Sequence, residues 1–250
     1  MKYFFRSLPA WFALSILGSL LVLPAGAQAR TASLASPAET PATTMAHYPW
    51  EFGPFMQGGV GTENRSDYHF TAAGVKFGKV VLGPALPGLL RGRFEYDVEF
   101  MPYWQAFTPK GGMRLAPVRQ ADGQYTNELL PHGGGTFTGL SITPIILRWD
   151  FVPRGHWAPF VQGGGGMIYT THKFPPDVLV PHGTMGGTSV WNFTPQFGVG
   201  VNYFISPRRS IYFEANAIHI SSSSLGDKNP GVNASVQFQL GYSWWWSRKH

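Results

Sequence analysis

The residues best suited to chemistry in this chain are His219 and Ser221, two positions apart in the stretch SIYFEANAIHISSSSL (210–225). On a β-strand, side chains at i and i+2 share a face, about 6 to 7 Å apart at the backbone. A serine hydroxyl becomes a good nucleophile when a neighbouring base takes its proton, and an imidazole can be that base. The pair therefore suits the hydrolysis of an acyl ester.

The stretch that carries this pair has the alternation of a β-strand. One side carries Ile211, Phe213, Ala215 and Ala217, and the other carries Tyr212, Glu214 and Asn216. The apolar side continues into His219 and Ser221. If that side faces lipid, the two reactive groups lie on the outside of a membrane barrel.

The rest of the chain has the pattern of such a barrel. In 93–100 (RFEYDVEF), Phe94, Tyr96, Val98 and Phe100 alternate with charged residues. The predicted strands cover 50–61, 68–82, 93–100, 136–151, 157–171, 189–204, 210–225 and 232–246. Each pairs an apolar or aromatic face with a polar or glycine-rich one, and no helix is predicted that could cover them. We therefore predict an all-β fold, an eight-stranded antiparallel transmembrane β-barrel of the outer-membrane type.

The connections support this topology and give the barrel two ends. The links at 152–156 and 206–209 are short, whereas those at 108–134 and 172–188 are long and rich in Gly, Pro and polar residues. With a periplasmic amino end, the long links face outward, and His219 and Ser221 lie at the outer end of their strand. The charged residues expected to neutralise one another inside the barrel are Arg93, Glu95, Asp97, Glu99, Arg148 and Glu214.

Composition agrees with an exported envelope protein. The chain has no cysteine, 31 glycines, 15% aromatic and only 13% charged residues. Residues 1–27 have the basic head, apolar middle and small-residue end of a signal peptide, with an alternative cleavage after residue 29. Residues 30–49 are predicted to be a disordered linker, and the barrel is expected to span 50–246. The predicted location is the outer membrane.

Charge and motif patterns argue against several other functions. Without the leader, which carries Lys2 and Arg6, 17 basic residues face 13 acidic ones, a formal charge of +4. That excess is too small and too dispersed to predict nucleic-acid binding. The histidines other than His219 show no metal-ligand spacing, so no metal site is expected. Gly163–Gly166 lacks the Lys and Ser/Thr of a phosphate loop and is read as a strand where bulky groups do not fit inside the barrel.

The run HISSSSLGDKNPGVN (219–233) resembles the signature of the PagL-type lipid A 3-O-deacylases, which are eight-stranded outer-membrane barrels. The resemblance implies His219 as the general base and Ser221 as the nucleophile. It further implies an oxyanion or supporting role for Asn229 and Gly231. The implied reaction is hydrolysis of the ester-linked acyl chain at the 3-position of lipid A in lipopolysaccharide, without a cofactor.

The third member of the triad departs from the family pattern. The family's orienting Glu is replaced by Asn233, and the Asn that typically follows the nucleophile is replaced by Ser222. An asparagine can hold an imidazole in the correct tautomer, but it cannot stabilise the imidazolium by charge. Strict alternation also places Asn233 on the inner face, so a bulge or loop is needed to bring it to His219. Asp227 is the alternative acid.

Two other functions remain open from the sequence. The first is a non-catalytic structural or adhesive outer-membrane barrel that uses the long links at 108–134 and 172–188. The second is a soluble lipid-binding barrel, which requires the apolar residues at 94–98 to point inward. The sequence also leaves the oligomeric state open between a monomer and a homodimer.

Overall fold

The computed structural model describes residues 48–175, 189–222 and 234–247. The strands in these ranges are β1 (Trp50–Gly61), β2 (His69–Ala85), β3 (Gly92–Phe107), β4 (Gly112–Arg119), β5 (Tyr125–His132), β6 (Thr136–Phe151), β7 (Trp157–Phe174), β8 (Ser189–Ser206), β9 (Arg209–His219) and β10 (Ala234–Trp246). Two short 3-10 helices accompany them, η2 (Glu63–Arg65) and η3 (Gly88–Leu90). Within the described ranges, no helix is long and apolar enough to cross a membrane. The predicted signal peptide and most of the predicted linker lie outside these ranges.

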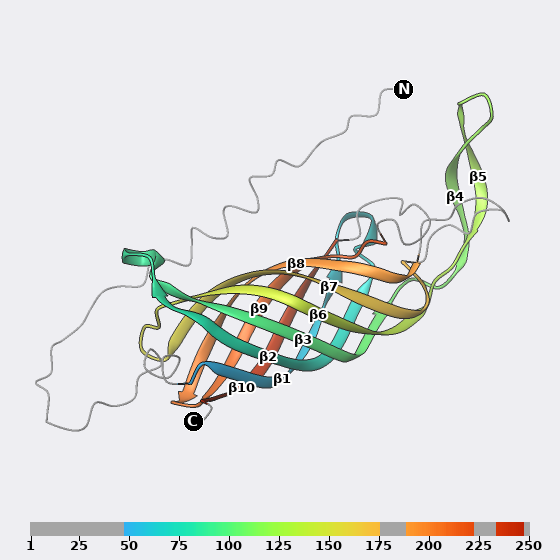
Figure 1. The fold of residues 1–250 in the computed structure, drawn as a ribbon. Helices are drawn as coiled ribbons and strands as arrows, with labels where there is room; N and C mark the ends of the chain where they lie inside the picture. Colours follow the sequence, from blue (N-terminus) through green and yellow to red (C-terminus); the bar gives the residue numbers. More distant parts are fainter. Residues whose placement is uncertain (1–47, 176–188, 223–233, 248–250) are drawn as a thin grey trace, which may run out of the picture. The chain divides into compact units, whose positions relative to one another are not determined.

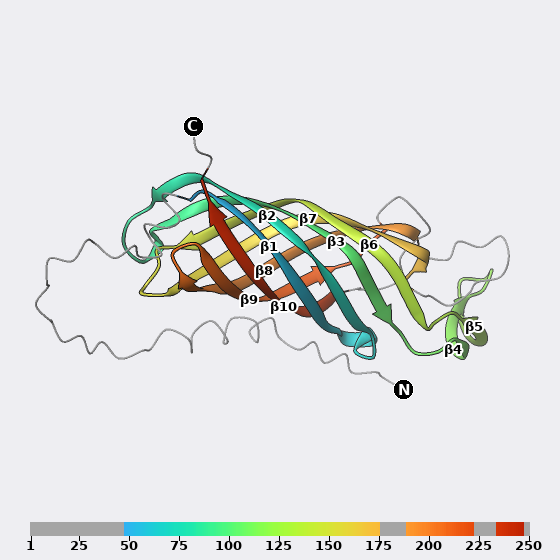
Figure 2. The ribbon, with the colours of Figure 1, turned by 90° about the horizontal axis from the view of Figure 1, so that it is seen from below.

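Eight strands form one closed antiparallel barrel in the order β1-β10-β9-β8-β7-β6-β3-β2 (Figures 1 and 2). The first strand pairs with the last, from Trp50 opposite Trp246 to Gly61 opposite Ser235, which closes the sheet. Closure removes the unpaired strand edges that an open sheet would expose. The predicted eight-stranded antiparallel barrel is therefore confirmed. β4 and β5 pair with each other in a separate two-stranded sheet.

Side chains alternate between the two faces of the barrel wall as the sequence predicts. On β3, Glu95 and Asp97 are fully buried, whereas Tyr96 between them is 38% exposed. On β8, the aromatic residues Trp191, Phe193 and Phe197 are exposed, and the buried polar residues are Asn192, Thr194, Gln196 and Asn202. Apolar groups outside and polar groups inside are the arrangement of a barrel that faces lipid. It excludes the soluble lipid-binding barrel, which needs the opposite arrangement.

The polar interior is organised around Arg148 on β6. Its Nε donates a hydrogen bond to Asp150 at 3.0 Å, and its Nη1 lies 3.6 Å from both Glu51 and Asp97. Lys76 Nζ lies 2.9 Å from Glu51 and completes the network. All the charged residues that the sequence predicted to face inward are buried, namely Arg93, Glu95, Asp97, Glu99, Arg148 and Glu214. Ion pairs between β1, β2, β3 and β6 thus fill the barrel interior in place of a pore.

An aromatic cluster fills the interior at one end of the barrel. Phe174, the last residue of β7, lies at its centre, with its ring 5.3 Å from that of Phe137 and 5.4 Å from that of Trp104. Phe70 and Tyr68 pack against the same ring at 6.3 and 6.4 Å. These residues come from the ends of β7 and β3 and the starts of β6 and β2. They lie at the end where the links β1–β2, β3–β6, β7–β8 and β9–β10 are found, which we call the site end.

The glycine tetrad of β7 has two different roles. A Cβ added to Gly164 or Gly166 would collide with the backbone oxygen of Ile145 or Ile142 on the neighbouring β6, whereas nothing lies within 4 Å of one added to Gly165. The prediction that glycine is present because larger groups do not fit therefore holds for Gly164 and Gly166. Gly165 faces open space.

β9 is shorter than the strand predicted at 210–225. It ends at His219, and Ser221 continues it only as an isolated bridge to Phe193 on β8. The register from Gln196↔Ile218 to Phe193↔Ser221 places Pro195 opposite His219. Proline has no N–H to donate to the ladder, which explains why regular pairing stops at this point.

The long link predicted at 108–134 contains the β4–β5 hairpin. Its register runs from Gly112 opposite His132 to Arg119 opposite Tyr125. The turn is closed by a hydrogen bond from Gln120 N–H to the Gln124 carbonyl, and Gly123 adopts a φ of 84° that favours glycine. The sequence pattern does not reveal these strands because Pro117 and Pro131 interrupt them.

Candidate active site

His219 and Ser221 lie at the site end of β9 on the outward face. The residues between and after them, Ile220 and Ser222, are only 2% and 0% exposed, whereas His219 and Ser221 are both half-buried. The predicted alternation therefore continues past the formal end of the strand. Both reactive side chains share the face that carries the exposed Phe213 and Ala217 lower on β9.

The backbone of Ser221 is fixed by Phe193. Phe193 N–H donates to the Ser221 carbonyl at 2.7 Å, and Ser221 N–H donates to the Phe193 carbonyl at 3.0 Å. Residues that exchange both bonds lie directly opposite each other with their side chains on one face. The Phe193 ring, 37% exposed, is therefore the cross-strand neighbour of the serine hydroxyl.

A polar ladder inside the barrel holds the end of β9 from behind. Gln57 Nε2 donates to Gln237 Oε1 at 2.8 Å, and Gln237 Nε2 donates to Ser235 Oγ at 2.9 Å. Ser235 Oγ then donates to the carbonyl of Ile218, the residue before His219, at 3.3 Å. Side chains of β1 and β10 thus support the backbone from which His219 projects outward.

The start of β10 is fixed by the link after β1. The backbone N–H and the side-chain hydroxyl of Thr62 both donate to the Ala234 carbonyl, at 2.9 and 3.1 Å. Ala234 lies opposite His219 in the β9–β10 register. The candidate pair is therefore bordered by β8 on one side and by a firmly held β10 on the other.

Below the pair, small residues form a strip on the outward face that we call the alanine lane, made of Ala215 and Ala217. Phe197 on β8 and Val236 on β10 lie opposite Ala217 on its two sides, and they are 58% and 39% exposed. The lane ends where Phe213 stacks on Phe238, with the rings 5.8 Å apart. A shallow apolar strip with bulky walls therefore leads from Ser221 down the lipid-facing wall.

Several residues predicted for the site lie outside the described ranges, namely Asp227, Asn229, Gly231 and Asn233. Ser222, which follows the candidate nucleophile, is fully buried. Of the two serines, Ser221 is therefore the one that lies on the outward face. In the described part of the chain, no residue forms a hydrogen bond or ion pair with the His219 ring. Glu214 is 1% exposed and belongs to the barrel interior, on the opposite face from His219.

The cluster in the described ranges that could hold a metal is formed by Glu51, Glu95 and Asp97, whose carboxylate oxygens lie within 4.8 Å of one another. Lys76 and Arg148 already bring positive charge to Glu51 and Asp97. The cluster lies inside the barrel, on the opposite face from the candidate pair. We assign it to the ion network of the interior.

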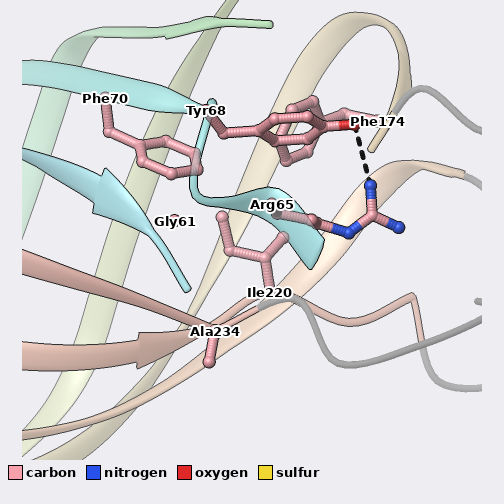
Figure 3. Close-up of a pocket in the computed structure, with 7 residues that line it drawn as sticks. All are labelled: Gly61, Arg65, Tyr68, Phe70, Phe174, Ile220 and Ala234. Atoms are coloured by element: carbon pink, nitrogen blue, oxygen red, sulfur yellow. Dashed lines mark hydrogen bonds between the residues drawn. The ribbon is translucent and has the colours of Figure 1, made fainter. Parts of the chain in front are cut away.

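Sequence reasoning missed a pocket at the site end, on the inner side of the wall whose outer side carries the candidate pair. It is a small, partly open pocket of about 200 Å³ including the open space at its mouth, and its walls are Gly61, Arg65, Tyr68, Phe70, Phe174, Ile220 and Ala234 (Figure 3). Ile220 separates His219 from Ser221 in the chain, and Ala234 is the register partner of His219. No sequence motif marks this pocket, because β1, β2, β7, β9 and β10 or their links all contribute to it.

Comparison with solved structures finds other membrane barrels. The outer membrane enzyme PagL is 16% identical with a TM-score of 0.40, over 76% of this chain and 97% of that one. OprG from Pseudomonas aeruginosa is 11% identical with a TM-score of 0.39, over 81% and 97%. The N-terminal barrel of OprF from the same organism is 10% identical with a TM-score of 0.33, over 77% and 99%. No curated protein matches the sequence.

The comparison with protein families gives a specific result. The family described as lipid A 3-O-deacylase (PagL) matches residues 90–243, which is more than half of the chain. The match includes β3, β8, β9 and most of β10, and therefore the strands around His219 and Ser221. The fold is that of an outer-membrane barrel, as predicted. This chain belongs to the lipid A 3-O-deacylase (PagL) family.

Proposed function

We propose that the protein is an outer-membrane serine esterase that removes the ester-linked acyl chain at the 3-position of lipid A. The observation that carries the proposal is the placement of His219 and Ser221 on one outward face, at the end of a barrel whose outer wall is apolar. Membership of the deacylase family supports the substrate class. An ester in the outer leaflet would reach this face directly from the membrane.

The proposed reaction uses the two side chains in turn. Ser221 Oγ attacks the ester carbonyl while the His219 imidazole takes the hydroxyl proton. The tetrahedral intermediate collapses, the bond to the sugar oxygen breaks, and the imidazolium gives its proton to that oxygen. Water, activated by His219, then hydrolyses the acyl-serine and releases the fatty acid.

The surroundings of Ser221 restrict which groups can stabilise the oxyanion. The Ser221 N–H already donates to the Phe193 carbonyl. Donors for the developing charge must therefore come from the segment after Ser222 or from elsewhere, a role that we propose for Asn229 and Gly231. We also propose Asn233, with Asp227 as the alternative, as the partner of the His219 ring.

The proposal does not require a second subunit, since both reactive residues lie close together in one segment, at the end of β9 and two residues beyond it. The family match and the fold give no support for the homodimer that the sequence left open. We propose that residues 1–27 or 1–29 direct export, followed by a linker to residue 49 and then the barrel.

Mass spectrometry of lipid A from cells with and without the protein tests this function. Expression should remove the mass of one ester-linked hydroxyacyl chain, and Ser221→Ala should abolish the change. Ser206→Ala, which alters a half-buried serine at the opposite end of the barrel, is the matched control and should behave as wild type. An unchanged lipid A profile with well-inserted wild-type protein would refute the proposal.

The β4–β5 hairpin favours a second candidate function, a non-catalytic adhesive barrel. Leu115 and Leu129 lie opposite each other across this hairpin and are 66% and 59% exposed. An exposed apolar pair on a surface hairpin is suited to contact with a partner. Under this alternative, deleting 108–134 abolishes adhesion, whereas Ser221→Ala and His219→Ala have no effect on it.

A further inference from the structure

The pocket at the site end, which lies behind the strand end that carries the candidate pair, contains one positively charged group, Arg65 (Figure 3). Arg65 ends η2 in the link between β1 and β2. The remaining walls are apolar apart from the Tyr68 hydroxyl. The pocket thus combines an apolar lining with a cation at the site end of the barrel.

Arg65 is held in place but is not neutralised by the described residues. Its Nη1 donates a 2.8 Å hydrogen bond to the Tyr68 hydroxyl, and its guanidinium lies 5.2 Å from the centre of the Tyr68 ring. In the ranges that the structure describes, no carboxylate forms an ion pair with it. A guanidinium offers five N–H donors in a planar fork, and Tyr68 accepts from one of its nitrogens.

The local backbone keeps Arg65 close to the end of β1. The Arg65 N–H donates to the Thr62 carbonyl at 3.0 Å, and Tyr68 N–H donates to the Arg65 carbonyl at 2.9 Å. A Cβ added to Gly61 would collide with the Arg65 carbonyl, so the turn needs glycine there to fold back this tightly. Thr62 also binds Ala234, the register partner of His219. The same turn therefore fixes both the cation and the strand beside the candidate pair.

We propose that Arg65 binds a phosphate group of the lipid A substrate and so orients its sugar over Ser221; this rests on the proposed function. Lipid A is a phosphorylated sugar that carries acyl chains, and its ester and phosphate groups lie close together at the membrane surface. A planar guanidinium suits bidentate binding of phosphate. Arg65 precedes the residues 90–243 that match the family, so this assignment rests on the structure of this chain.

The experiment compares lipid A that retains its phosphates with the same lipid A after phosphatase treatment. Wild-type protein in detergent micelles should show a kcat/KM roughly tenfold or more higher for the phosphorylated form, as expected for charge-assisted hydrogen bonds. Arg65→Gln should remove most of this preference, and Arg65→Lys should retain part of it, since a lysine keeps the charge but not the fork.

A matched control is present at the other end of the barrel. Arg208 donates a 2.8 Å hydrogen bond to the Tyr48 hydroxyl and lies 4.4 Å from its ring centre, a contact of the same kind as Arg65 with Tyr68. Arg208→Gln should keep the full preference for phosphorylated lipid A. Heat-modified mobility on gels checks that each variant remains a folded barrel.

A binding measurement separates this inference from the proposed function. Binding of both lipid A forms is measured by tryptophan fluorescence in the Ser221→Ala background, with and without Arg65→Gln. Tighter binding of the phosphorylated form, lost with Arg65→Gln, supports the assignment even if no hydrolysis occurs in any variant. Equal binding of both forms by folded protein that retains Arg65 overturns it.

Discussion

Ser221 and Phe193 exchange both of their backbone hydrogen bonds, at 2.7 and 3.0 Å, two residues beyond the last regular residue of β9. This bridge keeps the outward orientation of the strand after Pro195 has interrupted its ladder. The serine therefore points to the lipid-facing side without belonging to a continuous strand. An aromatic wall stands directly beside its hydroxyl.

The alanine lane predicts a dependence on acyl chain length. Ala217→Trp would fill the strip between Phe197 and Val236, where an acyl chain bound at Ser221 would lie. Each lost methylene contact costs about 0.8 kcal/mol, or about fourfold in binding. We expect kcat/KM for a long-chain ester to fall by about tenfold or more, while that for a short-chain ester changes little.

The control for this variant is Ile211→Trp, which adds the same side chain to the outward face of β9 near its other end. Ile211 is 41% exposed, so the larger ring should be accommodated by lipid. Equal losses on long-chain and short-chain esters in Ala217→Trp would show that the lane does not hold the acyl chain.

Asn233 stands where the family has its orienting Glu, and we predict that restoring the acid raises activity. In serine hydrolases, replacing the carboxylate that orients the histidine by an amide reduces kcat by up to about 10⁴. Asn233→Glu should therefore raise kcat for lipid A deacylation by about tenfold or more, measured by release of fatty acid.

Asp227→Asn distinguishes the two candidate partners of His219. If Asp227 already acts as the acid, Asp227→Asn should abolish activity and Asn233→Glu should bring no increase. If Asn233 is the partner, Asp227→Asn should leave kcat close to wild type. A chain in which neither variant changes kcat would have its histidine oriented by another group.

The glycines of β7 predict opposite effects of one substitution at adjacent positions. Gly164→Ala places a methyl group against the Ile145 carbonyl and should lower the free energy of unfolding by about 1 to 3 kcal/mol. Gly165→Ala points into open space and should leave stability unchanged or slightly raised. Urea unfolding in detergent, followed by tryptophan fluorescence, measures both. Equal destabilisation would contradict the distinction between the two glycines.

The interior ion network predicts a large effect of removing Arg148. Arg148→Met leaves Asp97 and Asp150 without their nearest cation and should cost about 3 to 5 kcal/mol of unfolding free energy. Adding Asp97→Asn and Asp150→Asn should recover part of that loss, since the unpaired charges are then removed. Arg209→Met, at an exposed position, is the control and should have little effect. If the triple variant recovers no stability, the loss comes instead from packing against Phe160, whose ring centre lies 3.6 Å from Arg148 Cζ.

The barrel itself could be predicted because its strands alternate strictly. β6 was predicted with its observed bounds, and the inward set around Glu95 and Asp97 follows directly from the period of two. The early end of β9 could not be predicted from β9 alone, because its cause is Pro195 on the neighbouring strand. The β4–β5 hairpin was missed because its prolines break the pattern.

In the candidate site, too, the residues of one strand could be predicted, whereas contacts between distant parts of the chain could not. His219 and Ser221 were found because their spacing and face are properties of one strand. Arg65 and Tyr68 were not found, since nothing in their sequence marks them until the closed barrel brings their link beside Ile220 and Ala234. Contacts between residues more than 150 positions apart in the chain depend on the register of β1 with β10, which sequence periodicity does not encode.

The pairing of β1 with β10 decides when the surroundings of His219 and Ser221 are completed during folding. Thr62 reaches Ala234, and Gln57 reaches Gln237, only once the final strand has joined the first. Until that seam closes, β10 still pairs with β9, but Gln237 lacks its bond from Gln57 and the start of β10 lacks its bonds from Thr62. A chain whose first and last strands have not yet paired therefore carries His219 and Ser221 without the hydrogen bonds that Gln57 and Thr62 contribute to their surroundings.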